Sequence, residues 1–107
     1  FGPAGGWGLR AKVTLLDAAL AELGAAAEYY AEHANERVAE AFLQDVLHAR
    51  QRLMEQPEIG TPISKRLRML TLRHFPYSLI YRFSADSVVI HAVAHQRRRP
   101  GYWAKRR

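Results

Sequence analysis

Two stretches in the first half of the chain repeat apolar residues every three or four positions, which is the spacing of an amphipathic helix. The first runs from about Ala18 to His33, and Asp17 before it is a favourable N-cap residue. The second follows Asn35, another favourable N-cap, and Pro57 and Gly60 end it. The two apolar stripes consist of Leu20, Leu23, Ala27, Tyr30 and Ala34, and of Val38, Phe42, Val46, Ala49 and Leu53. Because only one or two residues separate these stretches, they predict an antiparallel helical hairpin.

After Pro62 the apolar period changes to two, which predicts strands around Leu67–Leu72, Tyr77–Ser84 and Val88–His95. Short turns join these three runs into an antiparallel meander. On a regular last strand the residues that share one face are Val88, Ile90, Ala92 and Ala94, and those on the other are Val89, His91, Val93 and His95. A further β-branched run, Lys12 to Leu16, predicts a strand before the first helix. The predicted fold is α+β with the order β-α-α-β-β-β. Since both sheet faces are partly apolar, the helices should cover one face and another segment should partly cover the other.

The length of 107 residues, with 49% hydrophobic residues, predicts a single domain over residues 11–107. Residues 1–10 begin with the Gly- and Pro-rich run FGPAGGWG, which is typical of a disordered leader or a remnant of cloning and not of a signal peptide. No apolar run reaches the roughly 18–20 residues that a membrane-spanning helix requires. We therefore expect no association with a membrane.

Several kinds of catalytic site are excluded by the residue types present. The chain has no cysteine, and its serines do not lie in a Gly-x-Ser-x-Gly turn. His91 and His95 would lie roughly 13 Å apart along a regular strand, too far to share one metal ion. The acidic residues are almost all at polar positions of the helices, and no glycine-rich phosphate loop is present. We therefore expect no metal and no cofactor.

Charge is distributed unevenly between the two halves of the chain. Residues 1–64 carry five Lys or Arg and nine acids, for a net charge of −4. Residues 65–107 carry eleven Lys or Arg and only Asp86 as an acid, for a net charge of +10. Such a basic sheet and tail indicates a surface for an oppositely charged macromolecule. Both an acidic protein segment and the phosphates of a nucleic acid fit this pattern.

Four residues of the basic half have two interpretations each. Arg82, in the middle of a strand, requires either a charged partner or a position facing a groove. His95 is either a hydrogen-bonded residue at a strand end or a functional group. Tyr102 and Trp103 either anchor the tail on the sheet or stack on a ligand. The pattern alone leaves these alternatives open.

The motifs along the chain, taken in order, resemble those of the RelE/ParE superfamily of small bacterial toxins from type II toxin–antitoxin modules. The similarity extends from about Lys12 to Arg106, nearly everything after the leader. The residues that carry it are Tyr29-Tyr30, Ala41-Phe42, Pro57 followed by Gly60, Phe75-Pro76-Tyr77, Ile80-Tyr81-Arg82 and the tail His95-x-x-Arg98-x-Pro100-x-Tyr102-Trp103.

This resemblance implies a helical hairpin packed on a twisted antiparallel sheet. It also implies a cognate antitoxin, encoded alongside, whose acidic or amphipathic tail wraps the toxin in a cytoplasmic hetero-oligomer. Plasmid stabilisation is a role associated with such modules. The RelE-like branch cuts mRNA on the ribosome, whereas the ParE-like branch poisons DNA gyrase without being a hydrolase.

The positions that distinguish the two branches favour the ParE-like one. The mRNA-cutting branch typically carries an arginine after the aromatic that opens the third strand, and Tyr77 here is followed by Ser78. That branch often has basic residues on the preceding strand, where this chain has Met69 and Thr71. Stabilisation of a charged phosphorane should be poor without the strand arginine.

We therefore expect a toxin that inhibits DNA gyrase by binding and has no catalytic residues of its own. The expected target-binding residues are Arg82, His95, Arg97, Arg98, Arg99, Tyr102 and Trp103. One alternative is a ribosome-dependent mRNA endonuclease, in which His95, Arg97 and Tyr102 would carry the chemistry. Another is a non-toxic relative that only binds its antitoxin.

Overall fold

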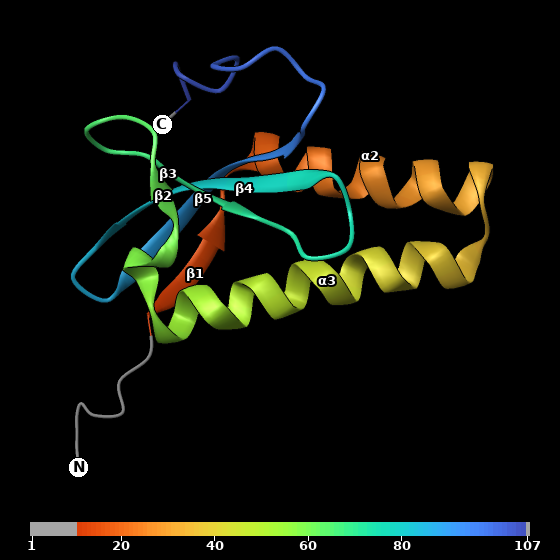
Figure 1. Ribbon diagram of the computed structural model, residues 1–107, viewed down its shortest axis with the longest axis horizontal. Helices are drawn as coiled ribbons and strands as arrows, with labels where there is room; N and C mark the ends of the chain where they lie inside the picture. Colours follow the sequence, from red (N-terminus) through yellow and green to blue (C-terminus); the bar gives the residue numbers. More distant parts are fainter. Residues whose placement is uncertain (1–10, 107) are drawn as a thin grey trace.

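Two antiparallel helices cover one face of a five-stranded sheet in the structure, a computed structural model that describes residues 11–106 (Figure 1). The elements are β1 (Lys12–Leu15), α2 (Asp17–His33), α3 (Glu36–Glu55), the 3₁₀ turn η1 (Pro57–Ile59), β2 (Thr61–Pro62), β3 (Arg68–Thr71), β4 (Tyr77–Ser84) and β5 (Ser87–His95). The leader expected over residues 1–10 lies outside the described residues. Within them, no helix is long and apolar enough to cross a membrane.

The strands lie in the order β1-β5-β4-β3-β2. Antiparallel pairing joins β2 to β3, β3 to β4 and β4 to β5. By contrast, β1 pairs with β5 in parallel, from Lys12 opposite Ser87 to Leu15 opposite Ile90. The α+β class and the predicted element order are confirmed, and the sheet is mixed because of β1. The short β2 was not predicted, since two residues are too few to establish an alternating pattern.

The helices begin close to the predicted positions. Asn35 caps α3, and its Oδ1 accepts a hydrogen bond of 2.9 Å from the backbone N–H of Val38. The prediction that Asp17 caps α2 is wrong by one residue, because Leu16 is the N-cap and Asp17 is the first helical residue. The Leu16 N–H donates to the carbonyl of Ile90, so strand pairing fixes the residue before the helix. Leu20, predicted in the apolar stripe, is 57% exposed.

Aromatic side chains fill the core between the helices and the sheet. The Phe42 ring lies 5.1 Å from that of Tyr77 and 5.4 Å from that of Phe75, measured between centroids. Tyr30 adds an edge contact to Phe75 at 5.1 Å. Each such pair is worth about 0.5–1.5 kcal/mol beyond the area that it buries. This cluster fixes the helical hairpin against one end of β4.

A β-bulge in β5 corrects the predicted alternation. Ile90 pairs with Tyr81 but Ala92 pairs with Ile80, so His91 is an extra residue without a partner opposite. The bulge moves Val93 into the helix-side core, while Ala92 and Ala94 pack on the other face. The prediction that Ala92 and Ala94 share a face with Ile90 is therefore wrong, because one inserted residue moves every later side chain of the strand to the opposite face of the sheet.

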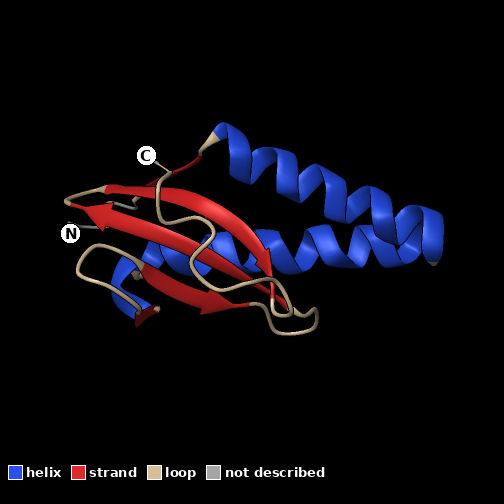
Figure 2. Ribbon diagram, turned by 90° about the horizontal axis from the view of Figure 1, so that it is seen from above, coloured by secondary structure: helices blue, strands red, loops and turns tan. Residues whose placement is uncertain are grey.

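The C-terminal segment, residues 96–106, covers part of the sheet face opposite the helices, as Figure 2 shows from above. There Tyr102 and Trp103 pack against a second apolar cluster, which consists of Leu67, Ile80, Ala92 and Ala94 together with Met69. The prediction that another segment partly covers this face is thus confirmed. It leaves the rest of the face open beside the tail.

Tyr81 ties the turn after α3 to the sheet. Its hydroxyl donates to the carbonyl of Pro57 at 2.6 Å and accepts from the N–H of Gly60 at 2.9 Å. A Cβ atom on Gly60 would lie 2.6 Å from the Tyr81 Oη and 2.9 Å from the Met69 carbonyl oxygen. The backbone at this position can approach the ring only because it carries no side chain.

We predict that Gly60→Ala lowers the free energy of unfolding by about 1–3 kcal/mol, since the new methyl group must displace Tyr81 or the β3 backbone. Urea unfolding followed by circular dichroism measures this change. Gly24→Ala is the matched control, because nothing lies within 4 Å of a Cβ there. In the middle of α2 that exchange should raise stability by about 0.5–1 kcal/mol. Equal effects of the two exchanges would contradict the close approach at Gly60.

Candidate functional site

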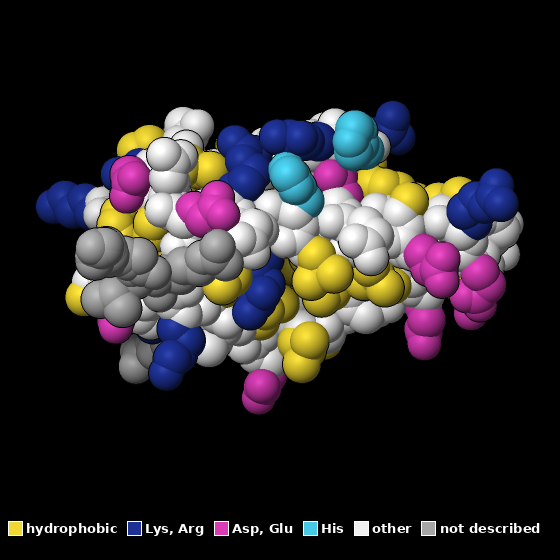
Figure 3. Space-filling model, turned by 90° about the horizontal axis from the view of Figure 1, so that it is seen from below, with side chains coloured by type: hydrophobic (Ala, Val, Ile, Leu, Met, Phe, Trp, Pro, Cys, Tyr) yellow, Lys and Arg dark blue, Asp and Glu magenta, His cyan; other side chains and the backbone are white. Residues whose placement is uncertain are grey.

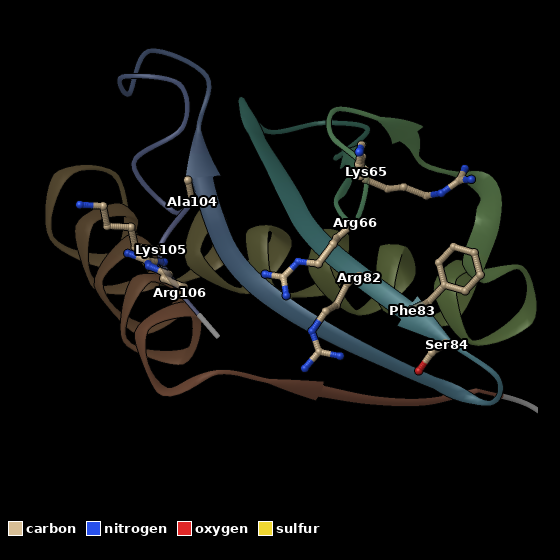
Figure 4. Close-up of a pocket in the computed structure, with 9 residues that line it drawn as sticks. Lys65, Arg66, Arg82, Phe83, Ser84, Ala104, Lys105 and Arg106 are labelled. Atoms are coloured by element: carbon tan, nitrogen blue, oxygen red, sulfur yellow. The ribbon is translucent and has the colours of Figure 1, made fainter.

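A groove of about 1090 Å³ lies on the open sheet face beside the tail (Figure 4). The residues that line it, here called the basic groove, are Lys65, Arg66, Arg68, Arg82, Phe83, Ser84, Ala104, Lys105 and Arg106. They come from the β2–β3 loop and β3, from the end of β4, and from the C-terminal tail. Figure 4 shows the side chains of Arg66 and Arg82 extending over the same part of the sheet. Residues far apart in sequence therefore form one cationic surface.

Arg82 lines this groove and is partly exposed. Among residues 11–106, the only ion pairs within 4.0 Å are those of Glu22 with Arg98 and with Arg106. Of the two interpretations left open by the sequence, the structure places Arg82 at a groove and not in an internal ion pair.

Glu22 of α2 holds the tail in place. Arg106 binds its carboxylate through two nitrogens, at 2.9 and 3.1 Å, and also donates to the carbonyl of His91 at 2.9 Å. The same carboxylate accepts a 3.0 Å hydrogen bond from the N–H of Val93. Arg98 lies 4.1 Å from the centre of the Tyr102 ring, on which Arg106 also packs. We call Glu22, Arg98, Tyr102 and Arg106 the tail clamp.

The sequence did not predict the tail clamp. Glu22 occupies a polar position of a helix, and nothing in the sequence distinguishes it from Glu28 or Glu32. Its partner Arg106 lies 84 positions away, a separation over which no local pattern operates. The clamp neutralises Arg106, one of the arginines assigned to the basic surface.

Protonation in the tail clamp is shifted by burial and charge. Burial alone would raise the pKa of Glu22, but Arg106, the nearby Tyr102 hydroxyl and the Val93 N–H outweigh it, and the pKa is lowered. Burial, with the Glu22 carboxylate as second cause, raises the pKa of Tyr102 to about 12. Glu22 is therefore ionised and Tyr102 neutral at neutral pH.

His91 is fully buried in the β5 bulge, and neither ring nitrogen has a hydrogen-bond partner among the described residues. Burial lowers its pKa, and the charges of Arg82 and Arg66 lower it further. The neutral ring adds no positive charge beneath the basic groove. It is also inaccessible to a substrate, because its nitrogens are enclosed.

The residues named for an mRNA-cutting site lie in different surroundings. His95 packs edge-on against Tyr77 at 5.0 Å, and its Nδ1 accepts a 3.0 Å hydrogen bond from the N–H of Arg97. Arg97 itself is exposed in the turn after β5. The Tyr102 hydroxyl is buried in the tail clamp. Arg99 is exposed, and Trp103 anchors the tail on the sheet.

The strand positions at which the mRNA-cutting branch carries basic residues are uncharged here and line a hollow of about 310 Å³, which His95 and Arg98 also line. Met69, Thr71 and Ser78 line it, and the hydroxyl oxygens of Thr71 and Ser78 lie 3.2 Å apart. The guanidinium of Arg98 lies 4.0 Å from the Glu22 carboxylate. Among residues 11–106, no group of three or more His, Asp or Glu side chains could hold a metal ion.

We predict that Glu22→Gln lowers the free energy of unfolding at pH 7 by about 1–3 kcal/mol, because Arg106 loses a charged partner. The pKa of Glu22 is lowered on folding, so its ionised form stabilises the fold above the ordinary value of 4.5. This stabilisation is lost as the pH falls through the lowered pKa, and the two proteins should converge in acid. Urea unfolding between pH 3 and pH 7 measures the difference. Glu28→Gln, an exposed exchange on the same helix, should change stability by at most about 0.5 kcal/mol.

Comparisons with known proteins agree with this fold and its sequence motifs. The family model described as "ParE toxin of type II toxin-antitoxin system, parDE" matches residues 13–100. No curated protein shows a significant sequence match. Among the similar solved structures is one described as "Chromosomal ParDE TA system from P. aeruginosa", with 20% sequence identity, a TM-score of 0.70, and coverage of 79% of this chain and 95% of that one. That likeness supports the fold, and the family match extends over most of the chain. This chain belongs to the ParE toxin family of type II toxin–antitoxin systems.

Proposed function

We propose that this chain is a toxin that inhibits DNA gyrase by binding to it, without a catalytic site of its own. The observation that carries this proposal is that Met69, Thr71 and Ser78, at strand positions where the mRNA-cutting branch has basic residues, leave this part of the hollow uncharged. A charged phosphorane needs cationic hydrogen-bond donors at that place. His95 and Arg98 also line the hollow, but His95 packs on Tyr77 and accepts a hydrogen bond from the N–H of Arg97, and Arg98 lies 4.0 Å from the Glu22 carboxylate. The Tyr102 hydroxyl is buried in the tail clamp.

A cognate antitoxin is the second part of this proposal. The helical hairpin exposes large apolar side chains, among them Leu43 and Leu47, one turn apart on α3. Figure 3 shows hydrophobic side chains exposed on the helix side of the molecule. An amphipathic antitoxin segment would bury such a surface, as helices in grooves do in other complexes. Toxin and antitoxin would then form a hetero-oligomer in the cytoplasm, where the gyrase target lies.

The test is induced expression with and without the antitoxin, with plasmid supercoiling and protein synthesis followed in parallel. We predict loss of supercoiling, DNA damage and filamentous growth, while protein synthesis at first continues. Co-expression of the antitoxin is the control and should restore growth. A purified sample should also stop supercoiling by gyrase in a reaction that contains no ribosomes.

Other outcomes would contradict the proposal. A rapid loss of protein synthesis with messages cut in the ribosomal A site would indicate the RelE-like activity instead. Normal growth without the antitoxin, from a chain that is expressed and folded, would indicate a non-toxic relative.

A further inference from the structure

Four cations of the basic groove have no acidic partner within 4.0 Å among residues 11–106, namely Lys65, Arg66, Arg82 and Lys105. The two remaining ones are already engaged. Arg106 binds Glu22, and Arg68 donates to the backbone carbonyls of Glu58 and Gly60. Unpaired positive charge of this kind attracts an anionic partner.

These four cations are held by three separate parts of the fold. Lys65 and Arg66 lie in the β2–β3 loop, Arg82 lies on β4, and Lys105 lies in the tail between Tyr102 and Arg106 of the tail clamp. Arg82 pairs with Val89 of β5, next to the last pair between β4 and β3 at Tyr81, so the sheet fixes the backbone at Arg82. The tail is fixed by the bidentate pair between Arg106 and Glu22. The positive surface therefore exists before a partner binds, which reduces the entropy lost on binding.

The lining of the groove suits a phosphate backbone better than a peptide. Its one aromatic residue, Phe83, lies beneath the Arg68 guanidinium, which is 5.3 Å from the ring centre. The groove thus lacks the exposed apolar anchor on which peptide and protein interfaces depend. Two of the free cations are arginines, whose planar guanidinium groups match phosphate oxygens in a bidentate geometry.

The groove is also built for contact with the backbone and not for reading bases. No Asn or Gln lines it to make the bidentate contacts that read adenine, and its free arginines match phosphate oxygens as well as they match guanine. Phosphate contacts position a nucleic acid without selecting its sequence. His91 beneath the groove is enclosed and its pKa is lowered, so it offers no exposed acid or base to cleave the bound strand.

We infer that the basic groove binds the phosphodiester backbone of DNA, independently of base sequence. This inference rests on the proposed function, because an inhibitor of a topoisomerase meets DNA that is already bound to its target. Contact with both the enzyme and its DNA would hold the toxin at the complex, as linked binding sites do. Inhibition would then depend on the groove even if the enzyme is bound through another surface.

The experiment measures binding of the purified full chain to a fluorescent 20-base-pair duplex of mixed sequence, by anisotropy, between 50 and 200 mM salt. With four free cations, the slope of log K against log salt should be about −3 to −4. Arg66→Ala and Arg82→Ala should each weaken binding about tenfold and reduce the size of the slope by about 1. A second duplex of different sequence should bind equally.

The matched control is Arg37→Ala, which removes the same charge from an exposed position in the first turn of α3, at the far end of the molecule. Its affinity should stay within about twofold of the unchanged chain. Equal affinity of all three variants, or no binding at 50 mM salt, would overturn the inference. Tighter binding of a single-stranded RNA of equal length, or of a poly-glutamate peptide, would overturn the assignment to DNA.

Inhibition of gyrase by the same variants separates this inference from the proposed function. If Arg66→Ala and Arg82→Ala lose DNA affinity and inhibit supercoiling less, both stand. If they lose DNA affinity yet inhibit as well as the unchanged chain, the role of the groove in inhibition is wrong and the proposed function stands. If the unchanged chain binds DNA through the groove but does not inhibit gyrase, the proposed function fails and the binding site stands.

Discussion

The β5 backbone beyond the end of β1 needs hydrogen-bond partners, and the sheet face that carries the basic groove depends on how this need is met. β1 pairs with β5 only as far as Ile90, and the backbone groups that follow would otherwise lack partners. A side-chain pair replaces the missing strand, since Glu22 accepts from the Val93 N–H and Arg106 donates to the His91 carbonyl. Buried backbone groups require such partners. One ion pair therefore closes the sheet edge and also fixes the tail.

Fixing the tail decides the form of the surface opposite the helices. Tyr102 and Trp103 cover the apolar cluster around Ile80 and Ala92, and the residues after them form one side of the basic groove. The tail thus lies between the hollow at Thr71 and Ser78 and the basic groove. The cations of the basic groove that lack an acidic partner, Lys65, Arg66, Arg82 and Lys105, do not line the hollow at Thr71 and Ser78. This arrangement suits binding of an anionic partner.

The β5 bulge has consequences at both faces of the sheet. By shifting the phase after Ile90, it places Val93 in the helix-side core and leaves Ala92 and Ala94 beneath the tail. Small residues at these two positions leave room for the Trp103 ring to pack on the sheet. The bulge also encloses His91, whose neutral form is favoured by burial and by the arginines around it. A regular strand would have placed a larger valine under the tail instead.

The sequence by itself determined the α+β class, the two helices with the Asn35 cap, the three strands of the meander and the basic character of the second half. These features arise from local periodicity and from residue types that favour caps and turns, so they can be read over a few positions. The tertiary structure alone decided the parallel pairing of β1, the bulge at His91, the pairing of Glu22 with Arg106 and the convergence of Arg66 with Arg82. Each depends on atoms brought together from distant parts of the chain. Such contacts do not determine the spacing of apolar residues between neighbouring positions, so the local sequence pattern does not predict them.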